Sequence, residues 1–83
     1  MRVLGIDYGD KWIGLALSDQ LKILASPLEV YIRKSLQQDL EYIKKLIQSN
    51  QVDTVVIGLP LNMDGTLGDR ALKTQEFGEQ LKS

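Results

Sequence analysis

One carboxylate stands out among the residues able to do chemistry, because Asp7 ends an apolar stretch and is followed by a turn. Residues 1–7 read Met-Arg-Val-Leu-Gly-Ile-Asp, and Gly9 comes two positions later. Aspartate is depleted in strands, and a carboxylate removed from water needs a partner. At the tip of a strand, Asp7 indicates either a metal or ligand site or an aspartate that caps its own turn. The stretch by itself leaves both interpretations open.

The composition restricts which metal such a site holds. The chain has no cysteine and no histidine, which excludes thiolate ligands and the imidazole that titrates near neutral pH. A metal here must therefore be bound by oxygen. Oxygen ligands select hard cations such as magnesium, manganese or calcium.

Two strands and a tight turn are needed to position Asp7. Residues 2–7 place apolar side chains on both faces of a strand, which is typical of a central strand covered on each side. Gly9 and Asp10 favour a hairpin that returns the chain antiparallel over residues 12–18. A third strand is expected over residues 28–32, and Pro27 before it favours an edge position.

The clearest helix begins at Ser35, where Ser-Leu-Gln-Gln fits a capping box ahead of an apolar repeat. Asp39 lies early in this helix, where a negative charge suits the helix dipole. Asn50 is expected to end the helix in a left-handed conformation. Residues 52–59 then read as a buried parallel strand beside the first strand. A second, less amphipathic helix is expected from Thr66 onward.

This strand order predicts where a site lies. Parallel neighbours end at the same edge of a sheet, so the loop after residue 59 is expected above the edge that carries Asp7. The residues expected to converge there are Asp7, Asp10, Lys11, Asn62 and Asp64. Asp64 precedes a glycine, and an ordinary turn is its alternative role.

Three further charged residues follow the second and third predicted strands. Asp19 is excluded from the site, because the antiparallel second strand carries it roughly 20 Å away. Arg33 and Lys34 follow the third strand. They are interpreted either as phosphate contacts or as solvated side chains beside a helix start.

The chain as a whole has 83 residues, enough for one small domain or a piece of a larger one. Its formal net charge of −1 gives no overall attraction to nucleic acid. No apolar run approaches the ~18 residues of a membrane span, and no signal peptide is apparent, so a cytoplasmic location without membrane contact is expected. The chain stops within an expected helix and leaves an apolar strand at an open edge. That indicates a truncated domain, or a homodimer that pairs through the exposed edge.

Four stretches together carry a specific resemblance. They are residues 4–9 (Leu-Gly-Ile-Asp-Tyr-Gly), 13–19 (Ile-Gly-Leu-Ala-Leu-Ser-Asp), 25–28 (Ala-Ser-Pro-Leu) with Arg33, and 56–66 (Val-Ile-Gly-Leu-Pro-Leu-Asn-Met-Asp-Gly-Thr). The chain closely resembles the N-terminal part of the YqgF family, also called RuvX, of Holliday-junction-resolvase-like proteins. The resemblance covers essentially the whole sequence.

The resemblance implies an α/β, ribonuclease-H-like fold, of which residues 1–83 form the N-terminal portion of a single domain. It implies that Asp7 is the first metal-binding carboxylate of a nuclease that uses Mg²⁺ or Mn²⁺. The nucleic-acid substrate would be precursor 16S ribosomal RNA, in ribosome biogenesis, or branched DNA such as a Holliday junction. Gly9, Lys11, Arg33 and Asn62 are the implied contacts at the edge of the site. The family's last strand and helix, with the other ligands, are expected beyond Ser83, so the chain alone is predicted to be inactive.

One departure from the family and two other functions stay open. The family usually has a basic residue where this chain has Trp12, which is interpreted as a base-stacking residue or, preferentially, as a core or edge aromatic. Actin, sugar kinases and heat-shock proteins begin with a similar Asp-x-Gly hairpin that binds nucleotide phosphates. They need two such domains, which this chain is too short to contain. A non-catalytic module that pairs through its open edge is the third possibility.

Overall fold

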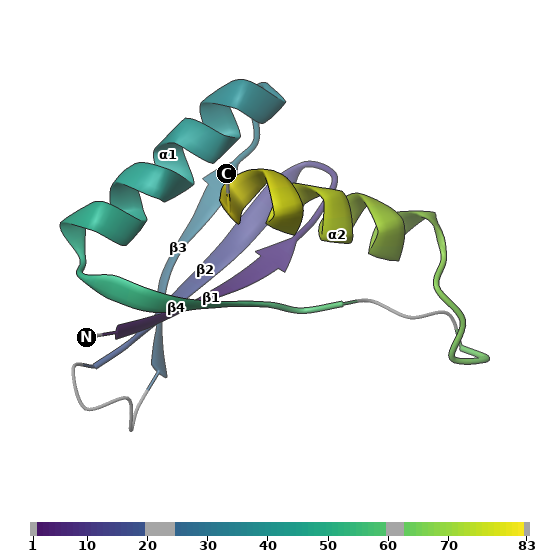
Figure 1. Ribbon diagram of the computed structural model, residues 1–83, viewed down its shortest axis with the longest axis horizontal. Helices are drawn as coiled ribbons and strands as arrows, with labels where there is room; N and C mark the ends of the chain where they lie inside the picture. Colours follow the sequence, from purple (N-terminus) through teal and green to yellow (C-terminus); the bar gives the residue numbers. More distant parts are fainter. Residues whose placement is uncertain (1, 20–24, 60–62, 83) are drawn as a thin grey trace.

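A computed structural model describes residues 2–19, 25–59 and 63–82. It contains a four-stranded sheet with two helices packed on one of its faces (Figure 1). The strands are β1 (Arg2–Tyr8), β2 (Trp12–Ser18), β3 (Ala25–Ile32) and β4 (Val52–Ile57), and the helices are α1 (Leu36–Ser49) and α2 (Asp69–Lys82). The predicted mixed α/β class is confirmed. Within the described ranges, neither helix has the length and apolarity needed to cross a bilayer.

The sheet has the strand order β3-β2-β1-β4. β2 pairs antiparallel with both β1 and β3, whereas β4 lies parallel to β1. Asp7 of β1 is opposite Gly14 of β2, and Gly5 of β1 is opposite Val56 of β4. β3 occupies one edge of the described sheet, but it begins at Ala25 rather than at residue 28 and includes Pro27. The proline is accommodated beside a shift in the β2–β3 register.

The hydrophobic core lies between the sheet and the two helices. Its buried side chains are Leu4, Ile6, Ile13, Leu15, Tyr31, Ile43 and Phe77. The strand members alternate along β1 and β2, as expected for one face of a pleated sheet. Gly78 of α2 faces β4, and a Cβ there would lie 3.3 Å from Cδ1 of Ile57. The missing side chain therefore lets α2 approach the sheet, which offsets part of the cost of a glycine inside a helix.

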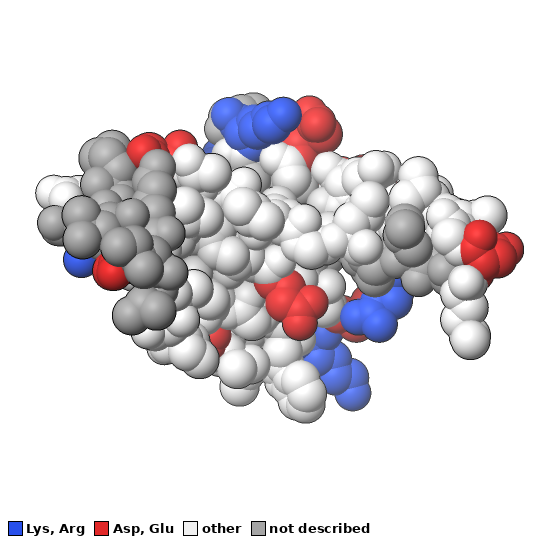
Figure 2. Space-filling view, turned by 90° about the horizontal axis from the view of Figure 1, so that it is seen from below, with Lys and Arg blue, Asp and Glu red and all other residues white. Residues whose placement is uncertain are grey.

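The opposite face of the sheet is open, and here the expectation that the first strand and the later parallel strand, β1 and β4, are covered on both sides is wrong. Val30 of β3 is 66% exposed and Val56 of β4 is 55% exposed. Both helices pack on the other face, and no other described element covers this one. Seen from below in Figure 2, the molecule shows a broad surface with few charged side chains. β4 also ends at Ile57, two residues before the predicted end.

The ends of α1 show one prediction confirmed and one corrected. Ser35 is the N-cap and accepts a hydrogen bond of 3.1 Å from the amide of Gln38. Asn50 has φ −106°, so it does not adopt the predicted left-handed conformation, which is found instead at Gln51 with φ 56°. Asn50 ends the helix by donating from both its backbone and its side-chain amide to the carbonyl of Leu46, at 3.0 and 2.9 Å.

The start of α2 also differs from the prediction. The helix begins at Asp69 rather than at the expected Thr66. The Thr66 hydroxyl donates a hydrogen bond of 2.6 Å to Asp64. That local turn before the helix explains why a capping pattern in the sequence did not mark the true first residue.

Candidate functional site

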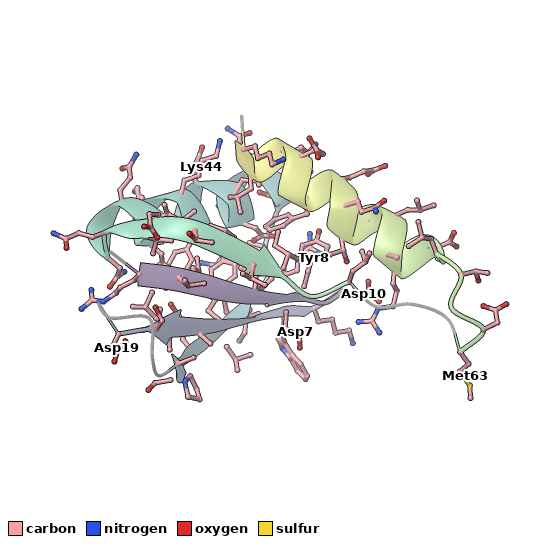
Figure 3. The ribbon with its side chains drawn as sticks, turned by 60° about the horizontal axis from the view of Figure 1, so that its bottom comes forward. Asp7, Tyr8, Asp10, Asp19, Lys44 and Met63 are labelled. Carbon is pink, nitrogen blue, oxygen red and sulfur yellow. The ribbon has the colours of Figure 1, made fainter. Side chains whose placement is uncertain are left out.

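Asp7 is the penultimate residue of β1, and its side chain points to the open face of the sheet. Figure 3 shows Asp7 directed away from the helices and Tyr8 directed toward them, as strand alternation requires. The carboxylate is exposed. A Cβ at Gly14, its neighbour on β2, would lie 3.4 Å from the Asp7 Cβ. The glycine therefore keeps the β2 side of the carboxylate clear of a side chain.

A shallow groove of about 550 Å³ runs across the open face beside Asp7. Small and apolar side chains form much of it: Gly5, Gly14, Ala16, Leu28, Val30 and Val56. Glu29 also borders the groove, but its carboxylate accepts a hydrogen bond from Tyr42, whose ring stacks on that of Tyr31. Asp7 is thus the charged group that this groove offers to a bound molecule.

The turn after Asp7 is held in one conformation by backbone contacts. The amide of Gly9 donates to the carbonyl of Trp12 at 3.0 Å. A Cβ at Gly9 would lie 2.7 Å from that same oxygen, so only glycine fits without a shift. The amide of Arg33 donates to the carbonyl of Lys11 at 2.8 Å, and its guanidinium donates to the carbonyl of Gly9 at 3.1 Å. Three residues predicted at the site, Gly9, Lys11 and Arg33, are therefore brought together.

Arg33 has a role that neither sequence interpretation included. Its Nε lies 3.0 Å from Oδ2 of Asp39, whose side chain has 0% exposure. The amide of Lys34 donates to the other carboxylate oxygen at 3.0 Å, and Tyr31 donates a further hydrogen bond. The guanidinium carbon lies 4.5 Å from the centre of the Tyr8 ring. This ion pair joins the start of α1 to the turn that follows Asp7.

The pKa of Asp39 reports how well this carboxylate is satisfied. Burial alone raises the pKa, because it disfavours the charged form. The hydrogen bonds from Lys34, Arg33 and Tyr31, together with the charge of Arg33, outweigh burial and leave the pKa of Asp39 below its usual value. Asp39 is therefore an ionised structural residue. The sequence signal was its early place in the helix, which alone does not reveal a partner six residues earlier.

The remaining predicted residues do not all converge on Asp7. Asp10 is exposed in the hairpin turn, near Asp7 in Figure 3, while Asp19 lies at the opposite end of β2, as predicted. Asp64 accepts hydrogen bonds from the amide and hydroxyl of Thr66, which lower its pKa. Met63, its neighbour, lies well away from Asp7 in Figure 3, so Asp64 takes its alternative role as a turn residue. Asn62 lies outside the described residues.

The residues present do not by themselves complete a metal site. Across the three described ranges, no group of three or more carboxylates is close enough together to hold a cation. Asp7 alone offers two oxygens, whereas Mg²⁺ takes six ligands, several of them commonly water. A cation here needs ligands from elsewhere, such as substrate phosphates or other protein groups.

These features define a class of protein: an α/β domain whose sheet presents one accessible carboxylate at the C-terminal end of its first strand, above an open groove. A family model described as RuvX: Holliday junction resolvase matches residues 1–83. The chain belongs to this family.

Relatives matched over almost the whole chain carry the name "Putative pre-16S rRNA nuclease". A protein of Halothermothrix orenii is 52% identical over 93% of the chain and 55% of its own length. One from Syntrophomonas wolfei is 48% identical over 99% of the chain and 58% of its own length. One from Carboxydothermus hydrogenoformans is 53% identical over 98% of the chain and 59% of its own length. The chain thus spans little more than half the length of these relatives.

Proposed function

We propose that this chain supplies the first metal-binding carboxylate, Asp7, of a metal-dependent nuclease with a ribonuclease-H-like fold that processes the 5′ end of precursor 16S ribosomal RNA. The observation that carries the proposal is the exposed carboxylate of Asp7 at the end of β1, in a family whose relatives are named as nucleases. A cytoplasmic enzyme of ribosome biogenesis fits these names.

The roles of this chain's residues follow from where they lie. Asp7 would hold Mg²⁺ or Mn²⁺, and the chemistry that such a cation would supply there is stabilisation of negative charge on a phosphate. Gly14 on β2 keeps that side of the carboxylate clear of a side chain, Gly9 allows the tight turn after Asp7, and Arg33 fixes the turn through the carbonyl of Gly9. Lys11 is exposed within that turn, where its ammonium contacts a phosphate of the substrate.

The chain alone is expected to be inactive. Cleavage with two cations needs several carboxylates around one phosphate, whereas the described residues bring two to the groove: Asp7, and Glu29, which accepts a hydrogen bond from Tyr42. The other ligands are proposed to come from segments like those in the part of the relatives' length that this chain does not span.

The test uses a chimera in which this chain replaces the matching 59% of the Carboxydothermus hydrogenoformans relative. The chimera should cleave a precursor 16S RNA fragment in Mg²⁺, lose cleavage in a chelator, and lose it in Asp7→Asn. Asp19→Asn is the control, because it removes the same charge at the opposite end of β2 and should leave cleavage unchanged. Full cleavage by Asp7→Asn, or by the isolated chain, would contradict the proposal.

A second substrate is favoured by the description of the family model, which names Holliday junction resolvase. The same chimera should therefore be offered a four-way DNA junction beside the RNA. Preferential metal-dependent cleavage of the junction would keep the role of Asp7 and replace the proposed substrate.

A further inference from the structure

Trp12 is unusually exposed for a tryptophan. It begins β2, an interior strand of the sheet, yet 60% of its surface is accessible. Large aromatic side chains contribute most to stability when they are buried, so the fold makes little use of the area of this indole. The preferred interpretation as a core or edge aromatic is therefore wrong: Trp12 is in neither the core nor an edge strand of the described sheet.

Trp12 lies on the same face of the sheet as Asp7. Asp7 pairs with Gly14, and Trp12 precedes Gly14 by two residues, so strand alternation places it on this open face. Trp12 lies about 7 Å along β2 from Gly14, the cross-strand partner of Asp7, because two residues of strand span that length. That spacing is comparable with the distance from a base to the nearest phosphates of one nucleotide.

The surroundings of Trp12 leave room for a flat group. Gly14, the next residue on this face of β2, has no side chain, and beyond it the groove continues over the sheet. On the β3 side, the cross-strand partner of Trp12 is Ile32, which is 66% exposed. The indole thus has an apolar neighbour on one side and open sheet on the other. The room for a flat group is therefore on the Gly14 side of the indole, over the open sheet, and Ile32 lies on the other side.

Charge on the open face favours contact through stacking over contact through phosphates. The chain carries a net charge of −1, and Asp7 repels a phosphate unless a cation lies between them. Lys11 is an exposed basic residue directly before Trp12. One lysine releases few counterions, whereas stacking of a base on an aromatic ring depends little on base identity or net charge.

We propose that Trp12 is a stacking platform for an unpaired nucleobase and holds a single-stranded segment of nucleic acid with a neighbouring phosphate beside Asp7. The inference rests on the proposed function, which it narrows to a substrate that is single-stranded near the cleaved bond. A continuous duplex is a poorer ligand, because its bases are already stacked and paired.

Trp12 is the only tryptophan in the chain, so indole fluorescence reports on this side chain alone. The isolated chain is titrated in chelator with a mixed-sequence single-stranded RNA and with the same RNA in a duplex. The single strand should quench the fluorescence with a shallow dependence on salt, and the duplex should quench it much less. By fluorescence anisotropy of labelled RNA, Trp12→Ala should weaken single-strand binding roughly 10-fold or more, whereas Trp12→Phe should retain most of it.

Ile32→Ala is the matched control, because it removes an equally exposed apolar side chain directly opposite Trp12. It should leave RNA affinity unchanged, and circular dichroism should show all three variants folded. Equal affinity of Trp12→Ala and wild type, equal quenching by single strand and duplex, or an equal loss in Ile32→Ala would each overturn the stacking role. In each of these three outcomes the wild-type chain still binds RNA, so the stacking role fails while the proposed function stands.

Two other outcomes have a different meaning. If the wild-type chain and the chimera bind neither RNA, the proposed function fails together with the stacking role. If the fluorescence instead changes with protein concentration alone, and light scattering shows a dimer, a second copy covers Trp12 and the stacking role is overturned.

Discussion

The two faces of the sheet are built from alternate residues of the same strands, yet they differ in almost every physical respect. On one face Leu4, Ile6 and Ile13 are at most 4% exposed beneath α1 and α2. On the other, the exposed carboxylate of Asp7 lies beside a groove of small and apolar residues. Both faces are largely apolar in sequence. Apolar content alone therefore does not decide which face becomes a core and which is left accessible to a ligand.

The same contrast separates two aspartates. Asp39 is fully buried on the helix side, where an arginine, a tyrosine and a backbone amide satisfy its carboxylate. Asp7 is exposed on the open side, where its carboxylate is available to a cation. We therefore expect substitutions on the covered side to change stability, and substitutions on the open side to change binding.

Phe77→Ala should give the largest loss of stability. Phe77 is 1% exposed and stacks on Tyr8 at 4.3 Å between ring centroids, so truncation leaves a cavity in the core. The expected cost is about 3–5 kcal/mol, much of the stability of a domain of this size. Val30→Ala on the open face is the control and should change stability by less than about 0.5 kcal/mol. Urea unfolding measures both, and similar losses would mean that the two faces are not as different as their exposure indicates.

Asp39→Asn should come next, at about 2–3 kcal/mol. The substitution removes the charge opposite Arg33 and weakens the three hydrogen bonds to the carboxylate. Glu41→Gln, an exposed position in the same helix, is the matched control. Amide hydrogen exchange should also quicken at Gly9, because Arg33 loses the partner that holds it against this turn. Unchanged exchange at Gly9 would show that the Arg33–Asp39 ion pair does not hold the turn in its conformation.

The stability that Asp39 contributes should depend on pH in a defined direction. Its pKa in the folded chain is lower than in the unfolded chain, so the unfolded chain binds more protons in acid. The contribution is fully present above about pH 4, the range of an unperturbed aspartate, and is lost as the pH falls through the lowered pKa. Unfolding of wild type and Asp39→Asn is compared from neutral pH down to about pH 2.5. The difference between their free energies of unfolding should shrink in acid. A difference that grows would mean that folding raises the pKa of Asp39 instead of lowering it.

Asp7→Asn should have the smallest effect on stability, within about 0.5 kcal/mol, because the side chain is exposed. Thermal unfolding without metal measures it, with Asp19→Asn as the charge-matched control. A loss of several kcal/mol would show that Asp7 is a structural residue like Asp39. The same substitution is expected to abolish cleavage in the chimera, so the two measurements together separate function from fold.

Much of the local structure was predictable. Strand alternation indicated β1 and β2, and the serine before an apolar repeat marked the N-cap of α1 at Ser35. The glycine turn after an apolar strand singled out Asp7. Pattern reasoning failed where two local signals competed: it placed the left-handed residue at Asn50 instead of Gln51, and it began α2 at Thr66 instead of Asp69.

The sequence by itself determined the elements, their order and the position of Asp7 at a strand end, because these depend on residues within a few positions of one another. Only the tertiary structure decided which face of the sheet is covered, and that Arg33 binds both Asp39 and the carbonyl of Gly9. Such contacts join distant segments: Tyr8 of β1 stacks on Phe77 of α2, across most of the chain. Their partners are selected by packing in three dimensions, for which the local pattern of a sequence carries no direct signal.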